Sequence, residues 1–333
     1  MINVSIIIKA YNEERYIAKC VESALKALKK VGGNNEVILV DSLSKDKAVE
    51  IAKKYPIRII QLKPNWQKSA AAALETGYRY SKGKYIYVLD GDMTLDENFI
   101  SIALKKLKEN GNIAGIGGEI KFPRANNLLN KRAKKIYNNY KKTIHNFQVS
   151  ALGGGGLYKR SAIEDVSFLA NPYLYSDEES DLGYRLKKKG YEMLRLDIPC
   201  IIHYGYNSSP VKFVFSKFTS KYLQGTGQML RNYFGEKIFW KHIMEEKIRI
   251  FMLFWWLFFF ISIILLFIKP IMSYIYMILS LFFFLFILLQ KKSLKDFFYS
   301  ITSWSLAGIS IIIGFMKKPK DPLSYPRDAT IIK

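Results

Sequence analysis

Two carboxylates separated by one glycine stand at the end of a short apolar run. Residues 85–89 are apolar or aromatic, and Asp90, Gly91 and Asp92 follow them directly. We expect residues 85–89 to form a buried strand that brings both carboxylates to the sheet edge where open α/β folds bind ligands. Mg²⁺ and Mn²⁺ take such oxygens together with substrate phosphates, and a glycine lets a bulky ligand approach the backbone. The motif therefore predicts a metal–diphosphate site, with a solvated turn as the alternative.

A second acidic group lies in residues 177–181, which read Asp-Glu-Glu-Ser-Asp. Leu182, Tyr184 and Leu186 follow it, so we expect the acids to open a helix. The helix dipole favours carboxylates at that end of any helix. The position alone therefore does not require a catalytic role.

Alternating strand-like and helix-like stretches would position these groups. The expected strands are 4–8, 36–40, 57–61 and 85–89, and the expected helices are 16–30, 45–54 and 68–80. Single helices between strands imply parallel pairing and a doubly wound α/β sheet with its binding loops along one edge. Residues 10–13, Asp41 and the 90–92 triplet fall on that edge. Neither a Gly-x-Gly-x-x-Gly nor a P-loop sequence is present, which argues against those nucleotide folds.

Four segments resemble, in order and spacing, the family 2 glycosyltransferases. They are residues 4–14, 36–46, 90–92 and 177–186, and the resemblance extends from residue 4 to about residue 205. It implies the GT-A fold, a Rossmann-like α/β domain that uses nucleotide-diphosphate sugars with Mg²⁺ or Mn²⁺ and inverts the anomeric centre. Many members carry membrane helices after the catalytic domain, as this sequence does.

The resemblance also implies roles for the residues that bind the donor. Residues 10–13 match the nucleoside loop, Asp41 matches an acid near the base, and the 90–92 triplet matches the diphosphate and metal motif. Ser42 stands where many members have a second aspartate, so the base, uracil or guanine, stays open. Lys68 matches a position near the diphosphate, where a cation and a helix N-terminus favour anions, or it is simply solvated. The complete predicted set is Ala10, Tyr11, Asn12, Glu13, Asp41, Lys68, Asp90, Gly91 and Asp92.

The catalytic base follows from the same resemblance. Alignment on Asp181, Leu182 and Arg185 puts Glu179 where the catalytic aspartate of the family stands. Glu179 is therefore the first candidate for the general base, and Glu178 is the second. Either carboxylate would take a proton from an acceptor hydroxyl that attacks the anomeric carbon.

Four further positions match the acceptor and metal sides of the family's site. Gly154 and Gly155, within the run 153–156, would leave room for an acceptor sugar, with a flexible loop as the alternative, and Arg185 would lie nearby. His203 matches a position that approaches the metal or diphosphate in relatives, so the predicted metal set is Asp92, Asp90 and His203. A lone histidine is more often structural, and that reading stays open.

The apolar residues are concentrated towards the carboxyl end. Half of the 333 residues are hydrophobic, and the sequence is almost continuously apolar from Ile248 onward. The blocks 250–268 and 271–289 contain no charged residue, and 297–316 is uncharged but milder. Since about 20 apolar residues cross a bilayer, we expect two transmembrane helices and a third. The predicted division is a catalytic domain at 1–209, interfacial helices at 210–247, transmembrane helices at 248–316 and a basic tail at 317–333.

The charges around these blocks predict a cell-membrane protein with a cytoplasmic catalytic domain. Lys269 and Pro270 alone separate the first two blocks, which predicts a tight hairpin with both outer ends on one membrane face. Basic residues flank those outer ends, and the positive-inside rule places them in the cytoplasm. A full third crossing would put the basic tail outside, whereas a re-entrant or interfacial segment would keep it inside. The absence of a recognisable signal peptide favours the same orientation.

The net charge of +23 arises from 51 Lys and Arg against 28 Asp and Glu. No nucleic-acid-binding module is recognisable, so we expect no nucleic-acid partner. The basic stretch 121–142 carries apolar residues at helical spacing, which suits the surface of an anionic membrane. Cys20 and Cys200 give neither a disulfide framework nor a zinc cluster, which fits a reducing compartment.

Together these features predict a membrane-anchored inverting glycosyltransferase. Its partners would be a UDP- or GDP-linked sugar, a lipid-linked or cell-surface glycan acceptor, and membrane lipids. Transfer to polyprenyl phosphate itself is an alternative within the same class. A catalytically silent membrane scaffold that binds a nucleotide sugar is the alternative from another class.

Overall fold

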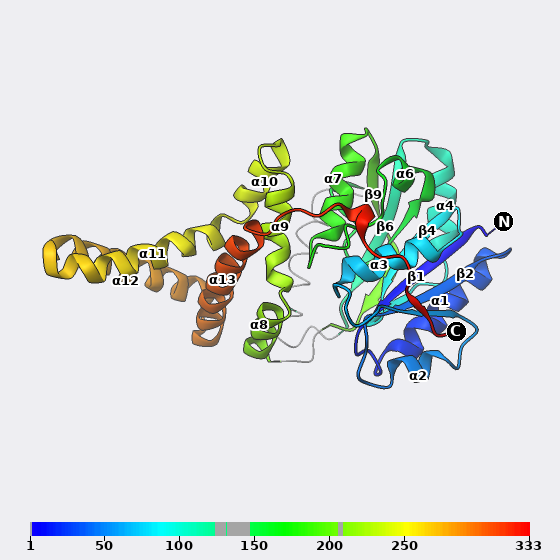
Figure 1. The fold of residues 1–333 in the computed structure, drawn as a ribbon, viewed down its shortest axis with the longest axis horizontal. Coiled ribbons are helices and arrows are strands. Elements are labelled where there is room, and N and C mark those ends of the chain that lie inside the picture. Colours follow the sequence, from blue (N-terminus) through cyan, green and yellow to red (C-terminus); the bar gives the residue numbers. More distant parts are fainter. Residues whose placement is uncertain (1, 124–130, 132–146, 206–208) are drawn as a thin grey trace. The chain divides into compact units, whose positions relative to one another are not determined.

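The computed structural model describes residues 2–123, 131, 147–205 and 209–333. They divide into two compact units, one made of residues 1–207 with 320–333 and the other of residues 208–319 (Figure 1). Most of the predicted membrane-surface stretch 121–142 lies outside the described residues. Each unit is described separately below.

The first unit is built on a mixed β-sheet. Within the described residues its neighbour order is β10-β3-β2-β1-β4-β8-β6-β9-β5, and β7 pairs with β9. Strands β3, β2, β1 and β4 are parallel, as predicted, whereas β8 runs antiparallel to both β4 and β6. The strands are β1 (Val4–Ala10), β2 (Glu36–Asp41), β3 (Arg58–Gln61), β4 (Tyr85–Asp90), β5 (Met93–Leu95), β6 (Ile113–Lys121), β7 (Phe147–Gln148), β8 (Gly156–Lys159), β9 (Glu192–His203) and β10 (Thr330–Ile331).

Helices cover both faces of this sheet, because successive strand residues point to opposite sides. Ile6 and Ile8 of β1 belong to one buried core, and Ile7 between them belongs to the other. The first core includes residues of α1 (Ile17–Val31), α2 (Ala48–Ala52) and α4 (Phe99–Glu109), and the second includes residues of α3 (Ala70–Tyr80), α6 (Arg160–Asp165) and α7 (Glu178–Lys188). The sheet is thus fixed from both sides, and its strand ends are held rigidly.

Two predicted helices are shorter in the structure. The helix expected at 45–54 is α2, which covers Ala48–Ala52. The helix expected from residue 68 begins at Ala70, because Ser69 caps it by accepting a hydrogen bond from the Ala72 N–H at 3.1 Å. Side-chain caps of this kind satisfy backbone donors that a helix cannot satisfy internally.

The carboxyl-terminal residues 320–333 belong to the first unit. Strand β10 pairs antiparallel with β3, and the pairing joins Thr330 to Gln61 and Ile331 to Ile60. Tyr325 follows the short helix η2 (Pro322–Ser324) and is only 2 % exposed. The tail therefore adds an edge strand and a core residue to the first unit, which its sequence does not indicate.

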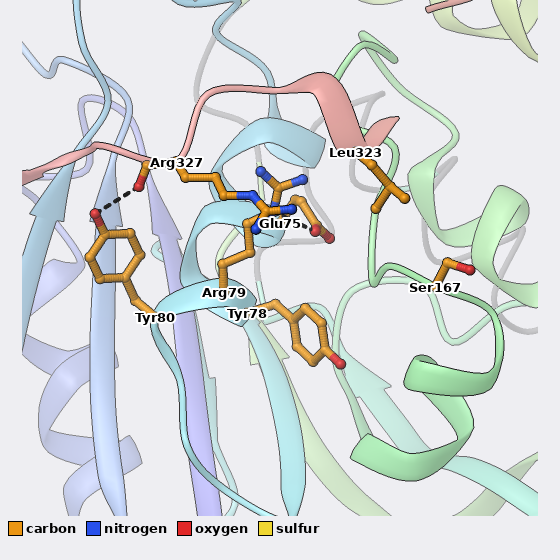
Figure 2. Close-up of a pocket in the computed structure, with 7 residues that line it drawn as sticks. All are labelled: Glu75, Tyr78, Arg79, Tyr80, Ser167, Leu323 and Arg327. Carbon is orange, nitrogen blue, oxygen red and sulfur yellow. Dashed lines mark hydrogen bonds and ion pairs between the residues drawn. The ribbon is translucent and has the colours of Figure 1, made fainter. Parts of the chain in front are cut away.

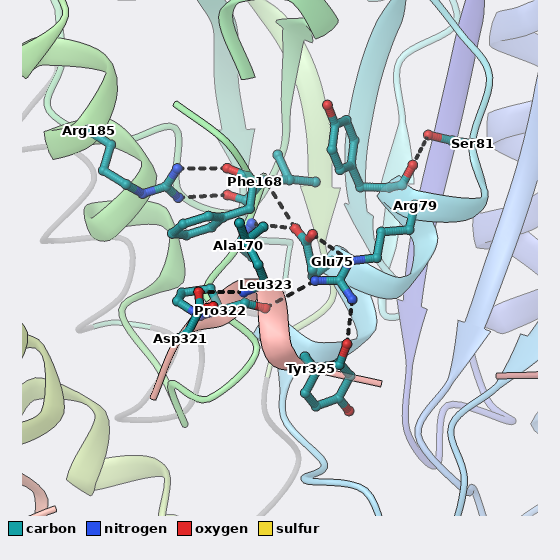
Figure 3. A network of polar contacts seen from close by, with 12 residues as sticks. Glu75, Arg79, Ser81, Phe168, Ala170, Arg185, Asp321, Pro322, Leu323 and Tyr325 are labelled. Carbon is teal, nitrogen blue, oxygen red and sulfur yellow. Dashed lines mark hydrogen bonds and ion pairs between the residues drawn. The ribbon is translucent and has the colours of Figure 1, made fainter. Parts of the chain in front are cut away.

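Polar contacts fasten this tail to α3. Arg79 donates to the carbonyl oxygens of Tyr325 at 2.8 Å and Pro322 at 3.1 Å, and it also pairs with Glu75 at 2.9 Å (Figure 3). The second carboxylate oxygen of Glu75 accepts the N–H groups of Leu169 and Ala170 at 3.0 and 3.1 Å. Burial raises the pKa of Glu75, and these hydrogen bonds work against that rise.

The second unit is helical. Among the described residues, its last three helices are long and apolar enough to cross a membrane. The first two of these three form a hairpin. In it, the rings of Trp255 and Phe283 stack with their centroids 4.6 Å apart, and the Ser273 hydroxyl donates to the carbonyl of Ser262 at 2.6 Å. The elements are α8 (Pro210–Thr219), η1 (Tyr222–Gln224), α9 (Gly225–Asn232), α10 (Lys237–Glu245), α11 (Lys247–Ile268), α12 (Pro270–Lys291) and α13 (Leu294–Phe315).

Candidate active site

The loops after β1 and β2 interlock at the carboxyl edge of the sheet. The Asn12 N–H donates to Ser44 Oγ at 2.9 Å, and the Asn12 side chain accepts the N–H of Lys45 at 2.8 Å. The Glu14 N–H donates to Asp46 at 2.9 Å. Asn12 has a φ of 59°, a left-handed conformation that asparagine tolerates better than most residues. These hydrogen bonds fasten the predicted nucleoside loop to the loop after β2.

Asp41 and Tyr11 differ in exposure at this edge. Asp41 is fully buried, and its carboxylate accepts hydrogen bonds from the backbone N–H and hydroxyl of Ser44 and, at 2.7 Å, from the Gln61 amide. Tyr11 is 53 % exposed. Asp41 therefore holds the loop that faces the predicted nucleoside, while the Tyr11 ring is free to contact a base. Direct contact between Asp41 and a base stays a prediction.

A largely buried lysine joins the two acidic motifs. Lys9, near the end of β1, lies 3.1 Å from Asp90 Oδ1 and 3.2 Å from Glu178 Oε1. Burial alone would lower the pKa of Lys9, but the neighbouring carboxylates outweigh it and raise the pKa well above its usual range. The ammonium therefore stays charged and connects the end of β4 to the start of α7.

Asp92 lies among further acids and a histidine. Its Oδ2 is 3.5 Å from His203 Nε2, at the end of β9. Burial raises the pKa of Asp92, and burial together with Asp92, Asp90 and Asp46 raises the pKa of Glu13 to about 8. An added cation would stabilise the ionised forms of these two partly buried acids.

The donor set fits a divalent ion that takes part of its coordination from a substrate. Asp90 and Asp92 supply the carboxylate oxygens that Mg²⁺ and Mn²⁺ prefer, and His203 lies beside Asp92. Among the described residues, no three acidic, histidine or cysteine side chains converge closely enough to hold an ion by themselves. Such an ion would need further oxygens, which a diphosphate offers.

Glu179 is held by the glycine-rich segment. Its Oε1 accepts the backbone N–H of Gly154 at 3.0 Å. Gly154 and Gly155 have φ values of 78° and 148°, which side chains disfavour, so glycine at these positions permits the turn. The glycine-rich segment and the candidate base are therefore in direct contact. Their shared role on the acceptor side stays a prediction.

The surroundings of Glu179 suit proton transfer near neutral pH. A small cavity behind Glu178 and Glu179 is lined by apolar groups, including Leu152, Leu169 and Leu182. Burial raises the pKa of Glu179 to about 7, although Lys9 works in the opposite direction. Glu179 thus titrates where a general base works best.

Two predicted residues have other surroundings. Lys68 is exposed and precedes the cap of α3. Arg185 pairs with Asp181 at 2.8 Å and donates to the carbonyl oxygens of Val166, Phe168 and Leu169. These contacts give Arg185 a structural role that fastens α7 to the preceding loop. Roles of Lys68 at the diphosphate and of Arg185 at the acceptor stay predictions.

The sequence reasoning missed Lys9. A lysine after Ile6, Ile7 and Ile8 of a buried strand is unusual, because lysine is almost never buried unless it is paired. That position, one residue before the nucleoside loop, is the signal that could have identified it. Its two partners lie 81 and 169 positions along the chain, so the sequence could not name them.

A larger hollow lies away from these carboxylates. It has a volume of about 390 Å³ between the end of α3 and the carboxyl-terminal tail (Figure 2). Its lining residues are Glu75, Tyr78, Arg79, Tyr80, Ser167, Leu323 and Arg327. Tyr80 closes one side by donating to the carbonyl of Arg327 at 2.9 Å.

Four parallel strands, of which β2 and β4 end in Asp41 and Asp90, continued by the antiparallel strand β8, are the GT-A fold of enzymes that use nucleotide-diphosphate sugars. Residues 5–167 match the family described as glycosyl transferase family 2. The chain therefore carries the catalytic domain of a family 2 glycosyltransferase. This domain lies in the first unit, residues 1–207 with 320–333, which is called the catalytic unit below.

Similar proteins act on lipid-linked substrates. The chain is 25 % identical over 242 residues, covering 68 % of itself and 74 % of the relative, to "Dolichyl N-acetyl-alpha-D-glucosaminyl phosphate 3-beta-D-2,3-diacetamido-2,3-dideoxy-beta-D-glucuronosyltransferase" of Methanococcus voltae. It is 28 % identical over 140 residues, covering 41 % of itself and 42 % of the relative, to "Undecaprenyl-phosphate 4-deoxy-4-formamido-L-arabinose transferase" of Pectobacterium atrosepticum. The chain thus spans less than half of the second relative.

Among solved structures, the mannosyltransferase PcManGT from Pyrobaculum calidifontis, in complex with GDP-Man and Mn²⁺, is similar to this chain. The similarity has a TM-score of 0.47 at 17 % identity and covers 67 % of this chain and 62 % of that one.

Proposed function

We propose that this protein transfers a sugar from a nucleotide-diphosphate donor to a lipid-linked acceptor at a membrane surface, with inversion of the anomeric centre. The observation that carries the proposal is the arrangement around Glu179. Glu179 is a carboxylate with a pKa of about 7 that accepts the Gly154 N–H at 3.0 Å, and the charge of Asp90 is one of the causes of its raised pKa. Lys9 connects the two groups through Glu178 and Asp90.

The structure favours Glu179 over Glu178 as the base. Glu178 is 7 % exposed, and its Oε1 forms an ion pair with Lys9 Nζ at 3.2 Å. Glu179 accepts a neutral backbone N–H and has the raised pKa that lets it take up a proton. We therefore assign proton transfer to Glu179 and positioning of α7 to Glu178.

The reaction would be a single displacement. Glu179 accepts the proton of the acceptor hydroxyl while that oxygen forms a bond to the anomeric carbon. The bond from this carbon to the diphosphate oxygen breaks on the opposite face, and the nucleoside diphosphate leaves with the electron pair. A divalent cation held by the Asp90 and Asp92 carboxylates together with diphosphate oxygens would act as a Lewis acid on the diphosphate. The interlocked loops at residues 10–14 and 42–47 would hold the nucleoside.

The lipid-linked acceptor rests on two supports. Three apolar helices accompany the catalytic unit, and both relatives named above carry dolichyl or undecaprenyl phosphate in their names. A polyprenyl phosphate oxygen is already ionised at neutral pH, so it needs no general base. The raised pKa of Glu179 therefore favours a hydroxyl acceptor, such as a sugar already linked to a lipid, over the polyprenyl phosphate itself.

The test is sugar transfer by the full chain in detergent, with UDP- and GDP-sugars, Mn²⁺ or Mg²⁺, and a membrane lipid extract as the acceptor source. Since a positioned base contributes about 10²–10⁴-fold, Glu179→Gln should lower kcat by that factor. Asp92→Asn should be equally damaging because it weakens the metal site. Glu109→Gln, at an exposed helix end, is the matched control and should leave activity unchanged.

Two outcomes would contradict the proposal. Full activity in Glu179→Gln together with loss in Glu178→Gln would move the base to Glu178. Donor binding without turnover in the presence of lipid extract, unchanged by Glu179→Gln, would identify a silent nucleotide-sugar-binding scaffold.

A further inference from the structure

We propose that the helical unit crosses the bilayer twice, through α11 and α12, and that α13 lies along the membrane surface on the side of the catalytic unit. This inference does not depend on the proposed reaction. It concerns which surface of the protein meets lipid headgroups and which meets hydrocarbon.

The carboxyl-terminal tail fixes the number of crossings as even. The chain leaves the catalytic unit after residue 207 and belongs to it again from residue 320. The returning segment pairs with β3 through Thr330 and Ile331. Tyr325 is buried and donates to the carbonyl of Gln67 at 2.8 Å. A strand that pairs with a sheet lies on the same side of a membrane as that sheet, so residues 208–319 must enter and leave on one face.

Two of the three candidate helices form the pair that crosses. Helices α11 and α12 are joined at Lys269, and no charged residue lies between Ile250 and Ile268 or between Ile271 and Leu289. Large apolar side chains stand exposed along both helices, for example Phe267 at 84 % and Leu281 at 67 %. Helices that are apolar on all sides belong in hydrocarbon.

In the contacts that the described residues define, helix α13 meets the half of this hairpin that lies away from its tip at Lys269. Trp304 lies under the Lys291 ammonium, at 5.3 Å, where α12 ends. The Trp256 indole donates to Ser305 at 2.8 Å. A Cβ on Gly308 would lie 2.6 Å from the carbonyl oxygen of Arg249, the third residue of α11. The middle of α13 therefore lies beside the first turns of α11 and the last turn of α12.

This register excludes a path parallel to the hairpin. Gly308 stands fourteen residues after Leu294, so at about 1.5 Å per residue it lies roughly 21 Å along the helix. If α13 ran alongside α12 towards the hairpin tip, Gly308 would lie near the middle of α11. It lies at the beginning of α11 instead, and Figure 1 shows α13 crossing the base of the hairpin.

The far end of α13 is held by a polar helix. A Cβ on Gly314 would lie 2.1 Å from the carbonyl oxygen of Gln224, and a Cβ on Gly227 would lie 2.1 Å from that of Ile311. These glycines let α13 pack directly against α9, an eight-residue helix that ends in Arg231 and Asn232. Because α9 is too short to span a bilayer and carries polar groups, its level is the membrane surface, and α13 shares that level.

The charges agree with this topology. Two crossings place Lys247, Arg249 and the basic residues at 291–295 and 317–320 on one face, and leave Lys269 alone at the other. Three crossings would divide these basic residues between both faces. The positive-inside rule favours the first arrangement and assigns the basic face to the cytoplasm.

Cysteine labelling in native membrane vesicles of both orientations tests the proposal. Lys269→Cys, Lys295→Cys and Lys318→Cys are each introduced at an exposed position of the full chain, and Lys105→Cys marks the catalytic unit. The native Cys20 and Cys200 are 0 % and 1 % exposed and should give little background. A membrane-impermeant maleimide should label residues 105, 295 and 318 from one face and residue 269 from the other.

Labelling of residue 318 from the same face as residue 269 would establish three crossings and overturn the proposal. Labelling of all four from one face would overturn it too, because the hairpin would not cross. Depth measurements with spin labels at Phe298 and Ile312, which are 63 % and 48 % exposed, provide a second readout. An in-plane α13 gives both labels the same shallow depth, whereas a spanning α13 would separate them by roughly 21 Å.

Discussion

Replacing Lys9 with methionine should destabilise the catalytic unit. The Lys9 side chain is 13 % exposed and lies within 3.2 Å of both the Asp90 and the Glu178 carboxylates. Removing one partner of a fully buried ion pair costs about 3–5 kcal/mol, because a buried charge is left uncompensated. The Asp90 side chain is 28 % exposed, so the expected cost here is the lower end of that range, about 3 kcal/mol. For a domain of this size, where 1 kcal/mol shifts Tm by about 2–4 °C, the apparent Tm should fall by roughly 6–12 °C.

The assay is thermal unfolding of the full chain in detergent, with two comparison variants. Lys26→Met removes a lysine that is 69 % exposed and paired to Glu97, so it should change Tm little. Lys9→Met combined with Glu178→Gln removes one of the stranded charges and should recover part of the loss. An unchanged Tm in Lys9→Met, or a double variant no more stable than the single one, would refute the ion-pair reasoning.

The same substitution has a kinetic consequence. Lys9 works against the rise in the Glu179 pKa, so its loss should raise that pKa further. Any residual activity of Lys9→Met should then reach half its maximum at a higher pH than in the unsubstituted protein. A purely structural lysine would lower the protein's stability and leave the pH profile in place.

The remaining predictions concern three positions. Because the base must be ionised, kcat/KM should rise with pH through about 7. The folded-state pKa of Glu179 lies above its usual 4.5, so ionisation costs stability as pH rises through that window, and Glu179→Gln should unfold at a higher temperature than the unsubstituted protein at pH 8 but not at pH 4. Gly154→Ala forces a side chain into φ 78° and should lower kcat by tenfold or more, whereas Gly111→Ala, with no atom within 4 Å, should not. Tyr325→Ala should cost about 3–5 kcal/mol of stability, and Tyr325→Phe, which loses only the hydrogen bond to Gln67, about 1 kcal/mol.

The parallel half of the sheet could be predicted because its signals are local. Each strand there is a run of buried apolar residues followed by a polar loop, and single helices between strands impose parallel pairing. The positions of Asp90 and Asp92 at the sheet edge followed directly. The order β4-β8-β6-β9 could not be predicted, because β8 has four residues and pairs with strands far from it in the sequence.

The acidic residues of the candidate site were predicted from the sequence, whereas Lys9, which pairs with two of them, was not. Glu179 came from the resemblance to a family, and no pattern in residues 177–181 distinguishes it from Glu178. Their different roles depend on Lys9 and the Gly154 N–H, which belong to distant parts of the chain. The role of a charged side chain depends on the groups that it contacts, and the tertiary structure determines which groups those are.

The tail shows the same limit and has a consequence for folding. Strand β10 has two residues, and it pairs with residues 60 and 61 after an intervening helical unit that is apolar enough for a membrane. We expect such a non-local pairing to form late in folding, because closing the long intervening loop costs conformational entropy before the contact can stabilise the chain. The buried Tyr325 donates to the carbonyl of Gln67, and it follows α11, α12 and α13 in the chain. We therefore expect the core of the catalytic unit to be completed only after these three helices have been synthesised, and a chain ending at residue 209 would lack part of that core.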